Sequence, residues 1–139
     1  MTTPLVCIVD DAADYRFLLQ QVFNRCFPAY TVALFAGGKA FLDALPQLSQ
    51  PPSLILLDCK MPGLDGYQTL IRLKEYPAYK QIPVVMMSAD AIALEINACY
   101  EAGADKFLRK PMAFDSLKEQ ITVICQYWLE TKQKTDEEV

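Results

Sequence analysis

The sequence predicts an α/β domain built on one parallel sheet, and two observations carry this prediction. Short apolar runs typical of buried strands alternate with segments whose apolar residues recur at helical spacing, the pattern of parallel strands joined by crossover helices. Four of the runs are followed at once by polar side chains, namely Asp10-Asp11, Asp58, Ser88 and Lys110. Because parallel strands end at the same edge of their sheet, we expect these side chains to meet there.

Five short runs, rich in Val, Leu, Ile, Met and Phe, are predicted to be the strands. In chain order these predicted strands cover residues 5–9, 30–35, 54–58, 84–87 and 106–108. The second run alone lacks a polar side chain at its end and leads instead into Ala36-Gly37-Gly38. This difference favours a place for it at the edge of the sheet, away from the site.

The segments between the strands are predicted to be five helices. The first begins near Ala13, and its apolar residues follow the i, i+3, i+4, i+7 rule until Pro28 ends it. The fourth is apolar almost all round, and Gly103 is a suitable stop for it. In chain order the predicted helices cover residues 13–26, 39–48, 66–76, 91–102 and 113–130.

This alternation predicts a three-layer sandwich with helices on both faces of the sheet. Right-handed crossovers favour the doubly wound strand order 2-1-3-4-5, the flavodoxin-like (βα)5 arrangement, with the first and third strands at the centre. The length of 139 residues fits one domain, expected over residues 1–130. The polar residues 131–139 are expected to form a disordered tail.

Composition excludes several classes of function. The net charge is −4 and no basic stripe is present, which argues against direct nucleic-acid binding. No apolar run approaches the ~20 residues that cross a membrane, and no signal peptide is evident, so we expect a cytoplasmic protein. The absence of histidine excludes Ser-His-Asp and Cys-His catalysis. Five widely spaced cysteines argue against a disulfide framework or a zinc site, and most are expected to be small buried residues.

Asp10, Asp11 and Asp58 are predicted to share one crevice. Two like charges about 4 Å apart repel by roughly 4 kcal/mol at an effective dielectric of 20, so three close carboxylates need a cation, a proton or distance. Mg²⁺ fits best, because it binds one or two carboxylates, keeps several waters and leaves room for phosphate oxygens.

A phosphoryl acceptor in this crevice must be a nucleophile, and Asp58 is the best candidate because its strand is central. Ser88 can donate a hydrogen bond to a phosphoryl oxygen, and Lys110 can supply a positive charge. Each residue alone also has a structural interpretation, since Asp10 or Ser88 can cap a helix and Lys110 can be a surface charge. Their common position after successive strands is what favours the site.

These motifs resemble the receiver domain of two-component response regulators over about residues 5–130. The resemblance rests on Val9-Asp10-Asp11, Leu57-Asp58, Met61-Pro62-Gly63-Leu64-Asp65-Gly66, Ser88-Ala89 and the segment from Gly103 to Pro111. It implies that Asp58 accepts a phosphoryl group from the phosphohistidine of a sensor histidine kinase or phosphotransfer protein. It also implies that Asp11, Asp58 and the backbone carbonyl of Lys60 bind Mg²⁺, with Asp10 helping through water.

The same resemblance implies roles for residues around the acceptor. Ser88 and Lys110 would contact the phosphoryl group, Phe107 would be the rotating switch aromatic, and the Lys110–Pro111 peptide would be cis. We expect no effector domain in these 139 residues, so output would pass through the fourth helix, fifth strand and fifth helix to a downstream protein, or to a second copy in a homodimer. The candidates for exposed apolar residues on these elements are Ile92, Ile96, Tyr100, Tyr127 and Trp128.

Two positions depart from the commonest receiver pattern. Cys59 is interpreted as a buried small residue in preference to an oxidisable neighbour of the site. Lys60 is the second such position, and the resemblance implies that Lys60 and Asp90 flank the path of hydrolytic water; we hypothesise that they pair and slow loss of the phosphoryl group. The alternative is that both are simply solvated, because an exposed pair contributes only ~0–1 kcal/mol.

Two other classes of function fit the sequence less well. A phosphohydrolase with an Asp nucleophile usually has a second acid two residues later, where this chain has Lys60. A flavin-binding domain of this topology would have a loop rich in Ser, Thr and Gly after the first strand, where this chain has Asp-Asp-Ala-Ala-Asp. The sequence therefore predicts a phosphoacceptor switch and not an enzyme, capable at most of self-phosphorylation from small donors and of autodephosphorylation.

Overall fold

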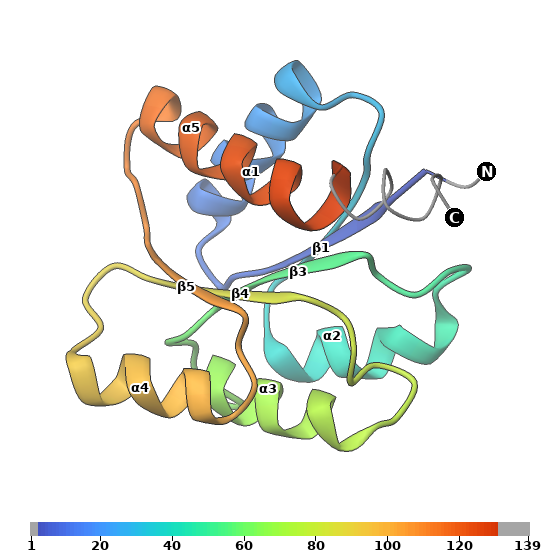
Figure 1. Cartoon of the computed structure of the whole chain (residues 1–139), viewed down its shortest axis with the longest axis vertical. Helices are drawn as coiled ribbons and strands as arrows, with labels where there is room; N and C mark the ends of the chain where they lie inside the picture. Colours follow the sequence, from blue (N-terminus) through green and yellow to red (C-terminus); the bar gives the residue numbers. More distant parts are fainter. Residues whose placement is uncertain (1–2, 131–139) are drawn as a thin grey trace.

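The computed structural model describes residues 3–130, in which five strands alternate with five α-helices (Figure 1). The strands are β1 (Leu5–Val9), β2 (Thr31–Phe35), β3 (Leu54–Asp58), β4 (Val84–Ser88) and β5 (Lys106–Arg109). The helices are α1 (Ala13–Cys26), α2 (Gly38–Ala44), α3 (Gly66–Glu75), α4 (Ala93–Glu101) and α5 (Phe114–Cys125). A 3₁₀ turn, η1 (Leu45–Gln47), follows α2, and a π-helical turn, η2 (Gln126–Glu130), follows α5. The predicted tail at 131–139 lies outside the described residues.

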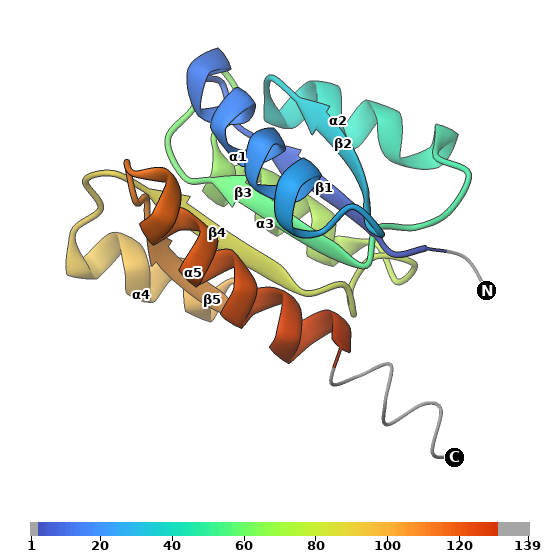
Figure 2. The same ribbon diagram turned by 90° about the horizontal axis from the view of Figure 1, so that it is seen from above.

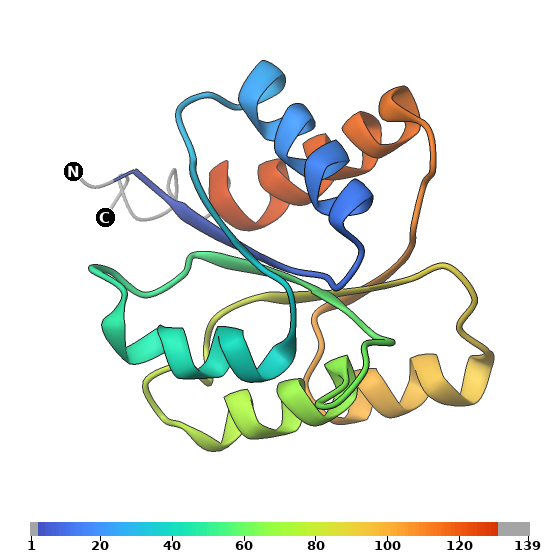
Figure 3. The same ribbon diagram turned by 180° about the vertical axis from the view of Figure 1, so that it is seen from behind.

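The strands form one parallel sheet in the order β2-β1-β3-β4-β5, which confirms the predicted doubly wound topology. Every residue of β1, β3 and β4 is buried, as expected for central strands covered on both faces. The edge strand β2 is only partly covered (Figure 3). The strand ends that carry polar residues therefore lie together at the carboxyl edge of the sheet.

The helices form two layers, with α1 and α5 side by side on one face and α2, α3 and α4 on the other (Figures 1 and 2). Alternate side chains of each central strand enter two apolar clusters, one under each layer. In β1, for example, Val6 and Ile8 pack toward α1 and α5, whereas Cys7 and Val9 pack toward the opposite layer. Both faces of the sheet are thus fixed by buried apolar contacts.

Several element boundaries differ from the sequence prediction. The second helix ends at Ala44, because the chain then tightens into the 3₁₀ turn that contains Pro46. The fourth helix begins at Ala93 and not at Ala91, whose side chain is buried before the helix starts. Helical spacing predicted one helix to Glu130, but the π-helical turn interrupts it and keeps Leu129 in the core.

The cysteines are mostly buried, as the sequence analysis expected. Cys7, Cys59, Cys99 and Cys125 are buried, and Cys26 is half-buried. The burial of Cys59 agrees with the sequence analysis. Among residues 3–130, no helix has the length and apolar composition that crossing a membrane requires.

Candidate functional site

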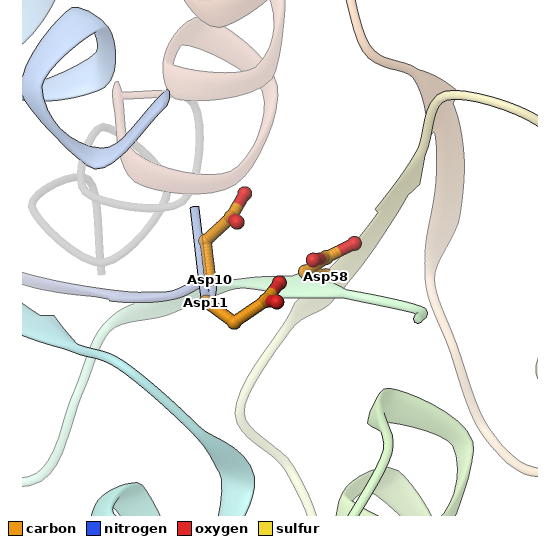
Figure 4. Close-up of side chains that lie close together, drawn as sticks. All are labelled: Asp10, Asp11 and Asp58. Atoms are coloured by element: carbon orange, nitrogen blue, oxygen red, sulfur yellow. The ribbon is translucent and has the colours of Figure 1, made fainter. Parts of the chain in front are cut away.

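Three carboxylates converge where β1 and β3 end. Asp10 and Asp11 follow β1, and Asp58 is the last residue of β3, which pairs directly with β1. One carboxylate oxygen from each residue lies within 4.8 Å of the others. In Figure 4 the side chain of Asp11 points toward that of Asp58. Asp10 and Asp58 are buried while Asp11 is exposed, so the cluster is reached from the side of Asp11.

Asp10 is fixed by the backbone and by two cations. Its Oδ1 accepts a hydrogen bond from the amide of Ala12 at 2.9 Å, and Arg16 Nη1 donates to its carbonyl oxygen at 2.7 Å. Its Oδ2 lies 2.7 Å from Nζ of Lys110, although this contact is not aligned as a hydrogen bond. The α1 N-cap is Ala12, which makes no side-chain cap, so Asp10 is not the N-cap residue, although its Oδ1 fixes the turn that leads into α1.

Among the described residues, Lys110 is the only one whose side-chain cation contacts two carboxylates of the acidic cluster. Its Nζ lies 2.7 Å from Oδ2 of Asp10 and 3.5 Å from Oδ2 of Asp58. The ammonium also lies 4.6 Å from the centre of the Tyr15 ring, a cation–π distance. Lys110 is therefore held in the crevice by two charges and one aromatic face.

The isomer of the Lys110–Pro111 peptide bond differs from the cis form that the family resemblance implied. No peptide bond in the described residues is cis, so the expected cis Lys110–Pro111 bond is wrong for this structure. The trans form is the more stable isomer of an X–Pro bond by about 0.5–1 kcal/mol. The hydroxyl of Tyr15 donates to the carbonyl oxygen of Pro111 at 2.9 Å, and the amide of Lys110 donates to that of Ser88 at 3.0 Å.

Tyr15 is a site residue that the sequence reasoning missed. Helical spacing accounts for it as one of the apolar positions of α1, and it is indeed buried. Its ring and its hydroxyl nevertheless support two adjacent residues, Lys110 and Pro111. The available signal was that Tyr carries a polar group, which usually needs a partner when the ring is buried.

The electrostatics of the cluster favour a bound cation. Burial and the charge of Asp10 raise the pKa of Asp58 to about 7, against the opposing effect of Lys110. Oxygen ligands and accumulated negative charge match the requirements of Mg²⁺ or Mn²⁺. Within the described chain, Asp10 Oδ2 is the one buried side-chain oxygen or nitrogen without an aligned hydrogen bond, although the Lys110 ammonium lies 2.7 Å from it and partly compensates its charge. The donor set therefore fits a hard divalent cation.

The loop between β3 and α3 approaches Asp58 closely. A Cβ on Gly66 would collide with the carbonyl oxygen of Asp58, so only glycine fits this approach. Gly63 has a positive φ of 74°, which glycine adopts without strain. Asp65 begins α3 with a capping box that includes Gln68. The Met61–Gly66 motif thus shapes a tight turn beside Asp58.

Ser88 and the Lys60–Asp90 pair lie on the β4 side of the crevice. Ser88 ends β4 and is buried, with its Oγ 3.4 Å from Oδ1 of Asp90. Lys60 Nζ lies 3.1 Å from Oδ1 of Asp90 and 3.5 Å from Oε1 of Glu95. Asp90 raises the pKa of Lys60, and Lys60 lowers the pKa of Asp90. The two residues are in contact, while the effect on phosphoryl lifetime stays a hypothesis.

Phe107 and the expected signalling surface lie at the β5 edge of the sheet. Phe107 is half-buried in β5, and its amide donates to the hydroxyl of Tyr100 on α4 at 2.8 Å. Of the apolar candidates, Ile92, Tyr100 and Tyr127 are exposed, whereas Ile96 and Trp128 are half-buried. The sequence analysis missed three further exposed apolar side chains, Leu94, Met112 and Val123.

The fold and the acidic cluster are those expected of a phosphoacceptor signalling domain. The family model described as the response regulator receiver domain matches residues 6–122. The chain therefore belongs to the response regulator receiver family. Members of this family are phosphoacceptor switches of two-component systems and not true enzymes, and they interact with histidine kinases.

Individual relatives agree with this assignment. The two-component response regulator ORR5 of Oryza sativa subsp. japonica is 36% identical over 110 residues, which are 78% of this chain and 79% of ORR5. The Mn²⁺-bound form of response regulator Rcp1 is 28% identical, with a TM-score of 0.81 over 92% of this chain and 96% of Rcp1. The phosphorylated cyanobacterial phytochrome response regulator RcpA is 26% identical, with a TM-score of 0.84 over 92% of this chain and 95% of RcpA.

Proposed function

We propose that Asp58 accepts a phosphoryl group from the phosphohistidine of a partner protein and that this phosphorylation switches the signalling state of the chain. The observation that carries this proposal is the convergence of Asp10, Asp11 and Asp58 within 4.8 Å, with Lys110 beside them. Asp58 is the acceptor because it ends a central strand, contacts Lys110 and lies next to both other acids.

In this reaction an Asp58 carboxylate oxygen attacks phosphorus, the P–N bond to the donor imidazole breaks, and the imidazole leaves with the bond's electrons. Lys110 stabilises the charge on the phosphoryl oxygens, and the Ser88 hydroxyl donates a hydrogen bond to one of them. Asp11, Asp58 and the backbone carbonyl of Lys60 would hold Mg²⁺, with Asp10 helping through water, and the bound ion would supply positive charge beside the phosphoryl oxygens. The buried position of Asp58 limits access of water to the product.

Intact-mass analysis after incubation with acetyl phosphate and Mg²⁺ tests this proposal. Wild type should gain one phosphoryl group, and Asp58→Asn should gain none. Asp43→Asn is a matched control, because Asp43 is an exposed carboxylate on α2 outside the cluster. Phosphorylation of the Asp58→Asn variant, or uptake by wild type at the same rate in excess chelator, would contradict the proposal.

The Lys60–Asp90 pair is proposed to prolong the phosphorylated state by covering the path of hydrolytic water. Its support is the 3.1 Å contact at the rim of the crevice. The Lys60→Ala/Asp90→Ala double variant should lose its phosphoryl group faster than wild type. A double alanine variant of the exposed Lys39–Asp43 pair, which has a 2.7 Å contact on α2, is the control. Equal half-lives in all three proteins would refute this role.

The signalling surface is proposed to be the α4-β5-α5 face, with Phe107 as its switch aromatic. Exposed apolar side chains at Ile92, Tyr100 and Tyr127 support contact with a downstream protein or a second copy. Sedimentation with Mg²⁺ and beryllium fluoride, a phosphoryl mimic, should show a dimer that Ile92→Ser weakens. Phe17→Ser, which changes an exposed residue of α1, is the control. An unchanged monomer in wild type would exclude self-association.

A further inference from the structure

Two buried thiols lie in contact beside the candidate site, and they come from distant parts of the chain. Sγ of Cys59 is 4.0 Å from Sγ of Cys99. Cys59 directly follows the acidic residue Asp58, and Cys99 is on α4. We propose that Cys59 and Cys99 are a redox pair that closes to a reversible disulfide and so ties α4 to the end of β3.

The packing of α4 allows the two sulfur atoms to approach further. A disulfide needs its sulfurs about 2.05 Å apart, so the pair must close by roughly 2 Å. All of α4 is described, and Cys99 is its one buried side chain. α4 lies beside α3 under the sheet (Figures 1 and 3). A helix with one buried side chain can shift without opening a large part of the core.

A pocket gives small oxidants a route to the pair. This pocket has a volume of about 570 Å³ and is lined by both cysteines together with Met61, Tyr67 and Ala98. The exposed fractions are 6% for Cys59 and 1% for Cys99, so Cys59 is the thiol that an oxidant reaches first. Burial raises the pKa of both thiols, which keeps the reactive thiolate scarce and makes the reaction slow.

A hydroperoxide can serve as the oxidant, in two balanced steps. The Cys59 thiolate attacks the terminal peroxide oxygen, which gives a sulfenic acid at Cys59 and releases the alcohol, or water in the case of hydrogen peroxide. The Cys99 thiolate then attacks the sulfenic sulfur, so the S–S bond forms, the S–O bond breaks and water leaves. The two thiols lose two protons and two electrons, and the peroxide is reduced. In a reducing compartment such a bond is transient and acts as a sensor.

Peptide mapping tests the pair directly, because trypsin places each cysteine on its own peptide. Cys59 lies on the peptide 40–60 and Cys99 on the peptide 81–106, and neither peptide contains another cysteine. The whole chain is treated with excess hydrogen peroxide, alkylated and digested without reductant. The expected product is a linked 40–60/81–106 peptide with the mass of both peptides less two hydrogen atoms, which dithiothreitol separates.

Three variants make the result specific. Cys59→Ser and Cys99→Ser should each abolish the linked peptide, whereas Cys26→Ser, which changes a half-buried cysteine of α1, should leave it unchanged. Formation of the bond should also slow amide hydrogen exchange across α4 by about tenfold. If a serine variant fails to fold, the wild-type map still decides, because the cross-link is read directly.

Two outcomes would overturn the proposal. One is that Cys59 and Cys99 remain alkylated as free thiols after Cys26 has been oxidised. The other is that Cys59 proceeds to a sulfinic acid with no linked peptide. This test does not depend on phosphorylation, so its failure leaves the proposed function intact.

Discussion

Leu56 and Asp58 stand two residues apart in β3, and both are almost completely buried, yet we expect their side chains to affect stability in opposite directions. Leu56 is 0% exposed and packs in the apolar cluster under α1 and α5. Asp58 is 4% exposed and places a carboxyl group beside Asp10. β3 therefore contains a side chain whose burial stabilises the fold and a carboxyl group whose charged form is disfavoured by burial. Substitutions in the interior of the sheet should lower the free energy of unfolding, and neutralising an acid at its carboxyl edge should raise it.

The largest effect is expected for the interior member of this comparison. Leu56→Ala removes a fully buried side chain and should lower the free energy of unfolding by about 2–5 kcal/mol. Urea denaturation followed by circular dichroism measures the change. Leu94→Ala is the control, because Leu94 is 77% exposed on α4 and its removal should change stability by less than about 0.5 kcal/mol. Equal losses in both variants would contradict the described packing.

Substitution of Asp58, at the carboxyl edge of the sheet, should instead raise the free energy of unfolding in the absence of divalent cations. Because the pKa of Asp58 is raised to about 7 from 3.8, the folded chain binds its proton more tightly than the unfolded chain does. The resulting destabilisation grows from about pH 4 to about pH 7 and is complete above it. At pH 8 in chelator, Asp58→Asn should raise the free energy of unfolding by about 1–3 kcal/mol.

The pH dependence of stability separates the effect of the raised Asp58 pKa from a pH-independent effect of the Asn side chain in Asp58→Asn. At pH 4 the carboxyl group is largely protonated in the folded state, so the advantage of Asp58→Asn should become small. Asp43→Asn, which changes an exposed carboxylate of α2, should be neutral at pH 8. Denaturation curves at the two pH values check the result, and a gain that persists undiminished at pH 4 would count against it.

Mg²⁺ should offset the loss of stability that the acidic cluster causes at the carboxyl edge of the sheet. A cation that binds only the folded chain adds about 1.4 kcal/mol at a free concentration ten times its Kd. Wild type should show a concentration-dependent rise in Tm with MgCl₂, and Asp11→Asn should show a much smaller one. NaCl at matched ionic strength controls for screening. An identical rise in both proteins would place the cation outside the acidic cluster.

The smallest single effect is expected for the hydroxyl of Tyr15, a residue of α1 that contacts the loop after β5. Tyr15→Phe keeps the ring but removes the hydrogen bond to Pro111, and should lower the free energy of unfolding by about 0.5–1.5 kcal/mol. Tyr15→Leu also removes the aromatic face beneath Lys110, which adds about 0.5–1 kcal/mol. Urea denaturation in chelator measures both. Equal stability of the two variants would show that the ring does not hold the ammonium.

The strand order and the meeting of the acids could be predicted because both follow from a repeated local pattern. Each apolar run is too short for a helix, and parallel strands bring whatever follows them to one edge. The prediction that Asp10, Asp11 and Asp58 lie close together therefore required no knowledge of side-chain packing. The pairing of Lys60 with Asp90 could also be anticipated, but only from the family resemblance, which places both positions beside the path of hydrolytic water.

Other contacts could not be predicted, because they depend on how separate elements pack. The spacing of α1 explains the burial of Tyr15 but not its two partners in the loop after β5. The contact between Cys59 and Cys99 joins residues that are 40 positions apart, and its existence depends on how α4 is placed. The Lys110–Pro111 bond was expected to be cis from resemblance alone, and the described chain has no cis peptide.

The position of Lys110 has a consequence for the affinity of the edge for metal ions. Its ammonium already acts as an internal counterion for Asp10 and Asp58, at 2.7 Å and 3.5 Å. The charge of these carboxylates is already partly compensated when a divalent ion binds. The net binding energy is therefore the attraction of the carboxylates for the ion less the part of their attraction for the Lys110 ammonium that is lost. Binding is then an exchange of counterions, which favours a readily reversible complex over a permanently occupied site.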